Sequence, residues 1–215
     1  MTRRTFLTLC ALLLTLGLFS FLGIRHTQQV APQSPPPQEG LPSIGGAFEL
    51  IDKDGKAWTD ADFKGKPMLI YFGYTYCPDI CPTALYAMTQ ALEMLGGAGA
   101  VQPVFVTIDP ERDTPDQLKL YAQNFHKDFI MLTGSQAQVK KAIKAYRVHA
   151  ARASEDRGSN DYLMDHSSII YFMDEKGQYQ AHFNHNTPAT EIVKKVREFL
   201  RSSSAVIPAT WEHEK

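Results

Sequence analysis

Short apolar runs and helical apolar spacing alternate along this chain. Four runs rich in β-branched and aromatic residues predict strands, and they cover residues 68–72, 101–108, 129–132 and 168–173. Segments with apolar residues at helical spacing predict helices, and they cover residues 83–95, 115–125, 136–146 and 190–200. Because strands and helices alternate, the pattern predicts an α/β domain whose mixed central sheet carries helices on both faces.

Two predicted hairpins flank this alternation. Residues 48–51 and 56–59 are separated by the turn sequence DKDG, which predicts an N-terminal β-hairpin extension. A second turn, DEKG, separates the strand at 168–173 from a partner at 178–183. We therefore expect one folded domain over residues 43–203, followed by a loose tail at 204–215.

The first 25 residues are predicted to be a single membrane anchor or an export signal. Arg3 and Arg4 precede an uncharged run from residue 6 to residue 24, close to the ~20 residues that cross a bilayer. No Ala-x-Ala site follows, which favours an uncleaved anchor in the inner (cytoplasmic) membrane with the domain facing the periplasm. The alternative is a twin-arginine export signal, which leads to the same compartment. Cys10 lies in the apolar run and is expected to face lipid.

Composition and charge narrow the range of partners. Residues 26–42 are rich in Pro, Gln and Ser and predict an extended spacer or a disordered linker. The net charge is −1, and because residues 1–42 carry three arginines and one glutamate, residues 43–215 carry −3. A mildly acidic domain without a basic face of the nucleic-acid type argues against a nucleic-acid partner.

Three cysteines are too few for a disulfide scaffold.

Two cysteines lie where a predicted strand ends and a predicted helix begins. The run YFGYTYCPDICP, residues 71–82, places Cys77 and Cys81 four residues apart, each followed by a proline. The first turn of a helix presents unpaired N–H groups that favour a thiolate, and thiolates are disulfide nucleophiles and soft metal ligands. A stiff loop on the solvent side is a poor place for inert core cysteines. A reactive or ligating pair is therefore favoured over a structural disulfide or two buried free cysteines.

His166 is the candidate third member of this site. A redox-type cysteine pair between the first core strand and its helix favours a thioredoxin-like fold, in which the loop before strand 168–173 faces the cysteine loop. The imidazole is thus predicted to approach both sulfurs, although a hydrogen bond at a strand end is the simpler role for an isolated histidine. A Cys₂His set suits Cu(I), or Cu(II) with one further ligand. Zinc could also bind this set and keep an open coordination position, as catalytic zinc does. Zinc hydrolysis is disfavoured because no carboxylate is obviously placed as a general base, and Asp79 is the one alternative considered for that role.

Several neighbouring residues have two possible roles. The DPERD run at 109–113 is either a charged turn that caps the next helix or a loop that tunes the thiolates or docks a partner. Tyr74 and Tyr76 are candidates for an exposed aromatic platform. The remaining histidines of the domain lie on helix ends or hairpin arms and are expected at the surface, namely His126, His149, His182 and His185. The last two are also candidate secondary copper contacts.

Four motifs in order resemble the Sco/SenC family of cytochrome c oxidase assembly proteins. They are YFGYTYCPDICP (71–82), VTIDPERDTP (106–115), LTG (132–134) and DHS (165–167). The resemblance covers residues 43–200 and implies a membrane-tethered, thioredoxin-like domain that binds copper through Cys77, Cys81 and His166. It also implies a role in building the copper-A centre of oxidase subunit II, by delivering copper or by reducing that subunit's cysteines. Many members have His where Tyr76 stands, but the ligand positions match.

These observations lead to three functional hypotheses. The first is a copper metallochaperone with a redox-active cysteine pair, whose partners are subunit II and other periplasmic copper chaperones or thiol reductants. Oxidation of the pair to a disulfide would remove both thiolates and release the metal. The main alternative is a metal-free thiol–disulfide oxidoreductase or peroxidase in which Cys77 attacks and Cys81 resolves. The third is a redox or copper sensor.

Overall fold

The computed structural model describes residues 43–153 and 162–204. The predicted anchor at 1–25 with Cys10, the linker at 26–42 and all but the first residue of the predicted tail at 204–215 lie outside these residues. No helix in the described part of the chain combines the length and apolar character needed to cross a bilayer.

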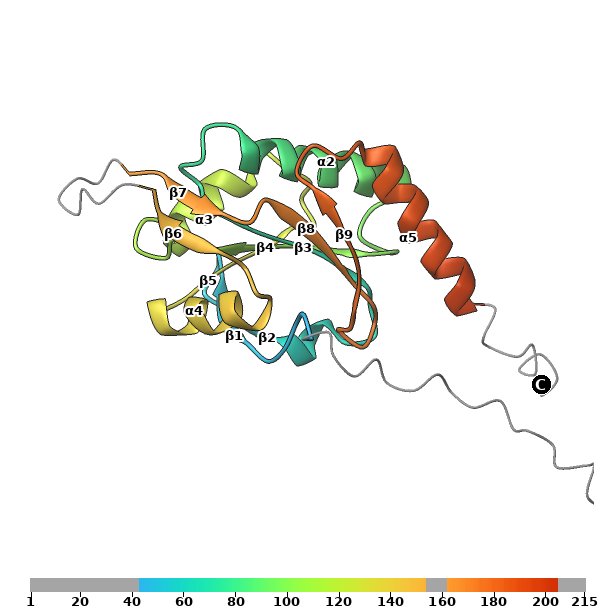
Figure 1. The fold of residues 1–215 in the computed structure, drawn as a ribbon, viewed down its shortest axis with the longest axis horizontal. Coiled ribbons are helices and arrows are strands. Elements are labelled where there is room, and N and C mark those ends of the chain that lie inside the picture. Colours follow the sequence, from blue (N-terminus) through green and yellow to red (C-terminus); the bar gives the residue numbers. More distant parts are fainter. Residues whose placement is uncertain (1–42, 154–161, 205–215) are drawn as a thin grey trace, which may run out of the picture. The chain divides into compact units, whose positions relative to one another are not determined.

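A seven-stranded mixed sheet forms the centre of the domain, in the order β2-β1-β5-β4-β3-β8-β9 (Figure 1). Its strands are β1 (Glu49–Asp52), β2 (Ala57–Thr59), β3 (Met68–Gly73), β4 (Gln102–Thr107), β5 (Ile130–Thr133), β8 (Ile169–Met173) and β9 (Tyr179–Asn184). Strand β4 runs parallel to both β3 and β5, whereas β1 and β8 join the central strands antiparallel. The predicted N-terminal hairpin, β1–β2, forms one edge, and the predicted second hairpin, β8–β9, forms the other.

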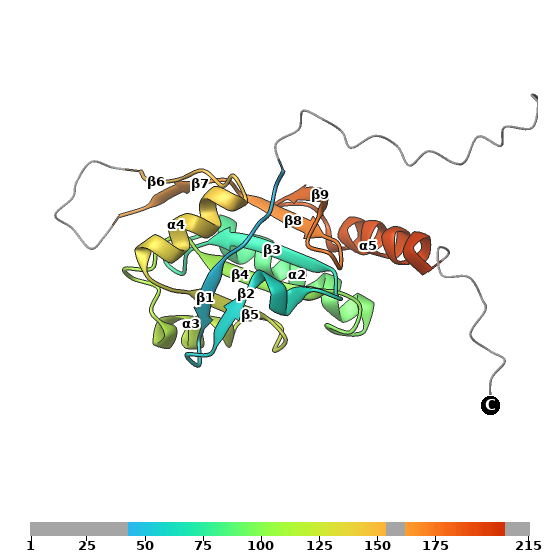
Figure 2. The same ribbon diagram turned by 90° about the horizontal axis from the view of Figure 1, so that it is seen from below.

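Helices cover both faces of the sheet, as predicted. They are α2 (Ile80–Leu95), α3 (Pro115–Ala122), α4 (Gln136–Ala145) and α5 (Ala189–Ser204), with one 3₁₀ turn, η1 (Asp60–Phe63). Helices α2 and α5 lie on one face and α4 lies on the other (Figure 1, Figure 2). Side-chain caps begin two of the helices, because Thr114 accepts the Gln117 N–H at α3 and Ser135 accepts the Gln138 N–H at α4.

Strand β3 is buried on both faces and leads directly to the cysteine loop. All six of its residues are buried, in agreement with its continuous apolar run. Successive side chains point to opposite faces. Tyr71 therefore reaches α2, where its hydroxyl lies 3.8 Å from Cys81 Sγ. Phe72 packs on the other face against Tyr146, next to α4, with ring centroids 5.1 Å apart.

Two local features differ from the predictions and both concern the cysteine–histidine region. Helix α2 begins at Ile80, three residues before the predicted start, because a proline is tolerated in the first turn of a helix. A second sheet pairs β6 (Ala150–Arg152) with β7 (Met164–His166), and Ala150 lies opposite His166. The sequences AAR and MDH have no apolar alternation, so the hydrophobic pattern carries no strand signal there. His166 thus ends a strand rather than lying in a loop. The mixed sheet, its helical layers and a Cys-x₃-Cys pair after the central strand make the fold thioredoxin-like, as expected.

Candidate metal centre

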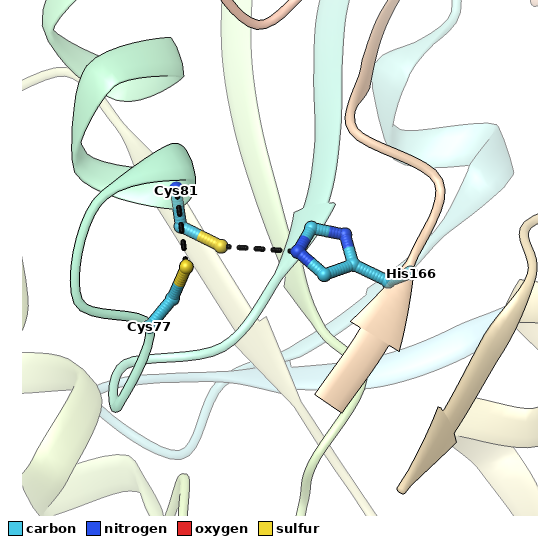
Figure 3. A group of neighbouring side chains, drawn as sticks. All are labelled: Cys77, Cys81 and His166. Atoms are coloured by element: carbon cyan, nitrogen blue, oxygen red, sulfur yellow. Dashed lines mark hydrogen bonds between the residues drawn. The ribbon is translucent and has the colours of Figure 1, made fainter. Parts of the chain in front are cut away.

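The structure brings together the three residues singled out in the sequence (Figure 3). Cys77 lies in the loop after β3, Cys81 in the first turn of α2 and His166 at the end of β7. The two sulfurs and one ring nitrogen of His166 all lie within 4.8 Å of one another. Within the described ranges, this is the sole group of three or more histidine, cysteine or carboxylate ligand atoms placed so closely.

Both cysteines are free thiols, and both are more buried than the position of their loop suggested. Cys77 is 8% exposed and Cys81 is fully buried, so the expectation of a solvent-side pair was wrong. Burial of Cys81 depends on Gly73. A Cβ atom at Gly73 would lie 2.9 Å from Cys81 Sγ and 2.8 Å from the Tyr71 ring. The glycine at the end of β3 therefore provides the space that the second sulfur occupies.

The helix terminus gives the two sulfurs opposite protonation preferences. The Cys81 N–H, in the first turn of α2, donates to Cys77 Sγ at 3.3 Å. The pKa of Cys77 is lowered, mainly by a hydrogen bond from the Cys81 thiol and also by this N–H, against the effect of burial. The pKa of Cys81 is raised because it donates to the Cys77 sulfur and because it is buried beside that negative charge. Without metal, the pair is therefore one thiolate, Cys77, and one thiol, Cys81.

The His166 ring is oriented with Nε2 toward the sulfurs. Nε2 lies 3.4 Å from Cys81 Sγ, and Nδ1 lies 3.2 Å from the Ser167 carbonyl oxygen. Because a carbonyl can only accept, we assign the proton to Nδ1, which leaves the Nε2 lone pair available to a metal. Tyr71 and Tyr74 contact the ring edge-on, with centroids at 6.1 Å and 5.8 Å. The imidazole is thus fixed in both tautomer and direction.

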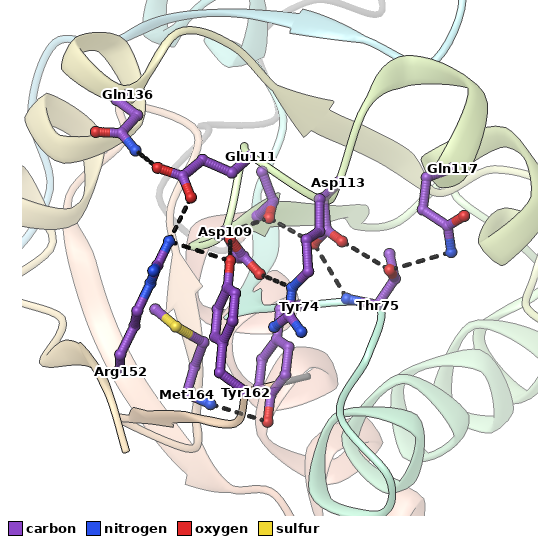
Figure 4. A network of polar contacts seen from close by, with 12 residues as sticks. Tyr74, Thr75, Asp109, Glu111, Asp113, Gln117, Gln136, Arg152, Tyr162 and Met164 are labelled. Carbon is purple, nitrogen blue, oxygen red and sulfur yellow. Dashed lines mark hydrogen bonds and ion pairs between the residues drawn. The ribbon is translucent and has the colours of Figure 1, made fainter. Parts of the chain in front are cut away.

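A hydrogen-bond network joins the cysteine loop to the strand that carries the histidine (Figure 4). The Tyr74 hydroxyl accepts the N–H of Met164, two residues before His166, at 3.2 Å. Asp113 accepts the N–H and the hydroxyl of Thr75, at 3.0 Å and 2.6 Å. Burial raises the pKa of Asp113, although the hydroxyls of Thr107 and Thr75 bind its carboxylate. This buried acid holds the segment that leads into Cys77.

The DPERD loop leads into a helix cap and also contacts residues near His166, whereas thiolate tuning or partner docking by this loop stays a prediction. Thr114 follows the loop and caps α3, which confirms the prediction of a charged turn that caps the next helix. Its acids also support the site, because Asp109 accepts the Tyr162 hydroxyl at 2.7 Å and the Arg112 Nε–H at 2.5 Å. The Tyr162 ring lies between two guanidinium groups, of Arg112 at 3.6 Å and of Arg152 at 4.1 Å. Arg152 also pairs with Glu111, which ties β6 to the same loop.

The other candidate residues stand apart from the three ligand atoms. Tyr74 is only 2% exposed, so its place in an exposed aromatic platform was wrong, whereas Tyr76 is 52% exposed. Asp79 is exposed and accepts the Thr83 hydroxyl at 3.3 Å. The remaining histidines of the domain do not join the group: His149 and His182 are exposed, and His126 and His185 are half-buried. The supporting roles of Tyr74 and Tyr162 were not predicted, because nothing in the local sequence marks their long-range hydrogen bonds.

The fold and the site together define a class: thioredoxin-like proteins with a Cys₂His metal-binding group at the mouth of a helix. The family model described as SCO1/SenC matches residues 36–201. The chain belongs to the SCO1/SenC family.

Individual relatives agree with this assignment. An SCO2-like protein of Rickettsia prowazekii is 45% identical over 152 residues, which cover 70% of this chain and 74% of the relative. The structure of Bradyrhizobium japonicum ScoI with copper bound is 40% identical, covers 73% of this chain and 99% of that one, and has a TM-score of 0.67. BsSco, described as a Sco-family cytochrome c oxidase assembly protein with a disulfide switch, is 27% identical, covers 79% and 98% of the two chains, and has a TM-score of 0.58.

Proposed function

We propose that this chain is a copper-binding metallochaperone that serves the assembly of the copper-A centre of cytochrome c oxidase. The observation that carries the proposal is the approach of two sulfurs and one imidazole nitrogen to within 4.8 Å of one another. Copper bound to ScoI of B. japonicum, at 40% identity, supports copper as the metal. The family's link to oxidase assembly, stated for BsSco, supports oxidase subunit II as the client.

The donor set suits copper better than zinc. Two sulfurs and one imidazole favour Cu(I), and Cu(II) accepts the same ligands with one more. The Cys77 thiolate and the Nε2 lone pair are ready to bind, whereas Cys81 must lose its proton, so loading releases one proton. Hydrolytic zinc chemistry would need a base beside the metal, but the candidate Asp79 binds Thr83 at the surface. Copper as cargo is therefore the better fit.

A second function is favoured by the unequal pKa values of the two cysteines. In a metal-free thiol–disulfide exchange, the Cys77 thiolate attacks a client disulfide and releases one client thiolate. Cys81 then loses its proton and attacks Cys77 in the mixed disulfide, which releases the second client thiolate and leaves a Cys77–Cys81 disulfide. The client disulfide is reduced by two electrons and the cysteine pair is oxidised by two. A periplasmic thiol reductant would then restore the reduced pair and be oxidised to a disulfide itself, whereas another periplasmic copper chaperone would be a partner in copper supply.

The proposed location follows from the amino terminus. Residues 1–25 serve as a single anchor in the inner membrane, with the arginines on the cytoplasmic side and the domain in the periplasm. The membrane association of relatives supports this, since one solved homologue is described as a lipoprotein of Bacillus anthracis and is 25% identical.

The test is an anaerobic Cu(I) titration of the reduced full chain in detergent, against a chromophoric competitor. We expect one copper per chain, and an affinity lowered at least about tenfold in Cys77→Ser, Cys81→Ser and His166→Ala. His182→Ala is the matched control, because it removes an exposed histidine outside the group. Unchanged binding in the three ligand variants would exclude this site. Suppose that His166→Ala abolishes copper binding but that the metal-free variant reduces an oxidised subunit II at the rate of the parent chain. Thiol exchange is then the primary function.

A further inference from the structure

The exposed face of α4 carries a cluster of positive charge. Lys140, Lys141 and Lys144 are exposed, as is Arg147 just beyond the helix, and we call these four residues the α4 basic face. The helix sequence QAQVKKAIKA contains no acid. None of the three lysines forms an ion pair with any residue in the described ranges. The cluster is notable because residues 43–215 as a whole carry −3.

The amino-terminal chain enters the domain beside this face. The Ser43 carbonyl oxygen accepts a hydrogen bond from Arg147 Nε at 3.4 Å. The Gly45 N–H donates to the Ala145 carbonyl oxygen, at the last residue of α4, at 3.0 Å. Figure 2 shows the first described residues passing next to α4. The 42 preceding residues, which include the predicted anchor, are therefore connected to the domain at the edge of the α4 basic face.

We propose that the α4 basic face rests on the anionic headgroups of the membrane that holds the anchor. The inference rests on the proposed anchor at residues 1–25. The 17 residues from 26 to 42 span about 23 Å as a flexible coil and at most about 53 Å as a polyproline helix. A tether of this length keeps the domain at a high local concentration over the bilayer. Lysine and arginine side chains then attract anionic headgroups once they come within a Debye length, about 8 Å at physiological salt.

This orientation leaves the cysteine loop clear of the lipid. Helix α4 lies on the face of the sheet opposite α2, whose first turn carries Cys81 (Figure 1). With α4 on the membrane, the cysteine loop is separated from the headgroups by the sheet. The contact would thus present the site to a client that projects from the same bilayer. An acidic protein is the other kind of partner that this charge could attract, but its binding would not require the chain to enter beside α4.

Helix α5 provides a matched control surface. It exposes Lys194 and Lys195, but Glu191 and Glu198 are exposed on the same helix. Cations interleaved with acids attract an anionic surface much less than the cations of α4, a helix whose own sequence contains no acid. Lysines of the two helices therefore serve as test and control in one molecule.

The experiment uses the full chain in nanodiscs of phosphatidylcholine, with or without phosphatidylglycerol. A neutral acetylating reagent is applied, and mass spectrometry gives the modification rate of each lysine. With phosphatidylglycerol, we expect the rates at Lys140, Lys141 and Lys144 to fall roughly threefold or more, whereas those at Lys194 and Lys195 stay nearly constant. High salt should restore the α4 rates, because the attraction is screened.

Two charge-reversal variants provide a second, independent measurement of the membrane contact. Arg147 is followed by its rate of modification with phenylglyoxal in phosphatidylglycerol nanodiscs. We expect it to be protected in the parent chain and in Lys194→Glu/Lys195→Glu, but exposed in Lys140→Glu/Lys141→Glu/Lys144→Glu. Thermal unfolding checks that both variants are folded.

The outcomes separate this inference from the anchor. A chain that enters neither kind of nanodisc overturns the anchor and this contact with it. A chain that enters both nanodiscs but shows equal α4 lysine rates overturns the membrane contact alone. If, in addition, crosslinking in cells joins these lysines to an acidic protein, the face binds a protein instead.

Discussion

At the scale of single residues, Gly73 is the position on which the geometry of the site depends most directly. A methyl group there would lie 2.9 Å from Cys81 Sγ and 2.8 Å from the Tyr71 ring, in a region with no free space. We predict that Gly73→Ala displaces the Cys81 sulfur and costs about 1–3 kcal/mol of unfolding free energy through overpacking. Urea unfolding measures the stability loss, and Cu(I) competition should show a weaker site.

Gly99→Ala is the control for this prediction. Nothing lies within 4 Å of a Cβ atom at Gly99, so the same chemical change meets no neighbour. Copper affinity should be unchanged in this variant. Equal copper affinity in Gly73→Ala and Gly99→Ala would show that the Cys81 sulfur does not need the space at Gly73.

The two cysteines should titrate far apart. The pKa of Cys77 is lowered by hydrogen bonds to its sulfur, and the pKa of Cys81 is raised by the neighbouring negative sulfur and by burial. Absorbance at 240 nm of the reduced, metal-free chain should therefore show one thiolate forming at acidic pH, well below the ordinary cysteine value of about 8.5. The acidic step should be missing in Cys77→Ser. An acidic step that survives this substitution would mean that the thiolate is elsewhere.

The same shifts have opposite effects on stability. A depressed folded pKa means that Cys77 stabilises the fold fully above its unfolded pKa, and that this contribution is lost as pH falls toward the folded value. A raised folded pKa means that Cys81 stabilises the fold below its unfolded pKa, and that this contribution is lost as pH rises beyond it. The reduced, metal-free chain should therefore lose stability relative to Cys77→Ser as pH is lowered from neutral.

At the scale of elements, the regular parts of the fold were predictable and the irregular ones were not. Strand β3 was readable as an uninterrupted apolar run, because a strand buried on both faces needs apolar side chains at every position. The pair β6–β7 could not be predicted, because AAR and MDH hold no periodic pattern and the two strands are separated by 11 residues rather than by a short hairpin turn.

The candidate site likewise has residues that the sequence predicts and residues that it does not. Cys77 and Cys81 were marked by their spacing at a strand–helix junction, and His166 became a candidate only once a fold was assumed. Burial of the cysteines was missed, because it depends on the missing side chain of Gly73 and on the rings packed around it. The contact of Tyr74 with Met164 was also missed, since it joins residues 90 positions apart. Such contacts follow from tertiary packing and leave no local signal.

The carboxylate of Asp113 is predicted to position the segment before Cys77. Its carboxylate binds the N–H and hydroxyl of Thr75 and the hydroxyl of Thr107, and it is fully buried. Asp113→Ala would leave the buried Thr107 hydroxyl and the half-buried Thr75 N–H without this partner, which costs about 1–3 kcal/mol. It would also free the segment before Cys77. We expect a lower urea midpoint and weaker Cu(I) binding.

Asp116→Ala is the matched control, because Asp116 is exposed in the first turn of α3. Its loss should cost at most about 1 kcal/mol through the helix dipole and leave copper binding intact. If Asp113→Ala loses stability but retains full copper affinity, the carboxylate stabilises the fold without positioning the cysteine loop.

At the scale of the whole molecule, the candidate metal-binding group joins two parts of the chain that are distant in the sequence. Cys81 and His166 are 85 residues apart, one at the start of α2 and the other on the small β6–β7 sheet. In the metal-free chain they are joined by the 3.4 Å contact of Cys81 Sγ with His166 Nε2, by the Tyr74–Met164 hydrogen bond and by the contacts of Tyr162 with the DPERD loop. A bound metal would strengthen this link, because coordinate bonds to both residues would replace the weak sulfur–nitrogen contact.

Copper should therefore stabilise the domain, and His166 should carry part of the effect. A ligand that binds only the folded chain raises the unfolding free energy by about 2.7 kcal/mol at a free concentration of 100 times its Kd. For a domain of this size the corresponding rise in melting temperature is about 5–10 °C. Anaerobic calorimetry of the reduced chain with buffered Cu(I) measures it. At the same free Cu(I), His166→Ala should lose most of the rise, whereas His182→Ala, which removes an exposed histidine of β9, should keep it. A full rise in His166→Ala would mean that the two sulfurs bind copper without closing the link to β7.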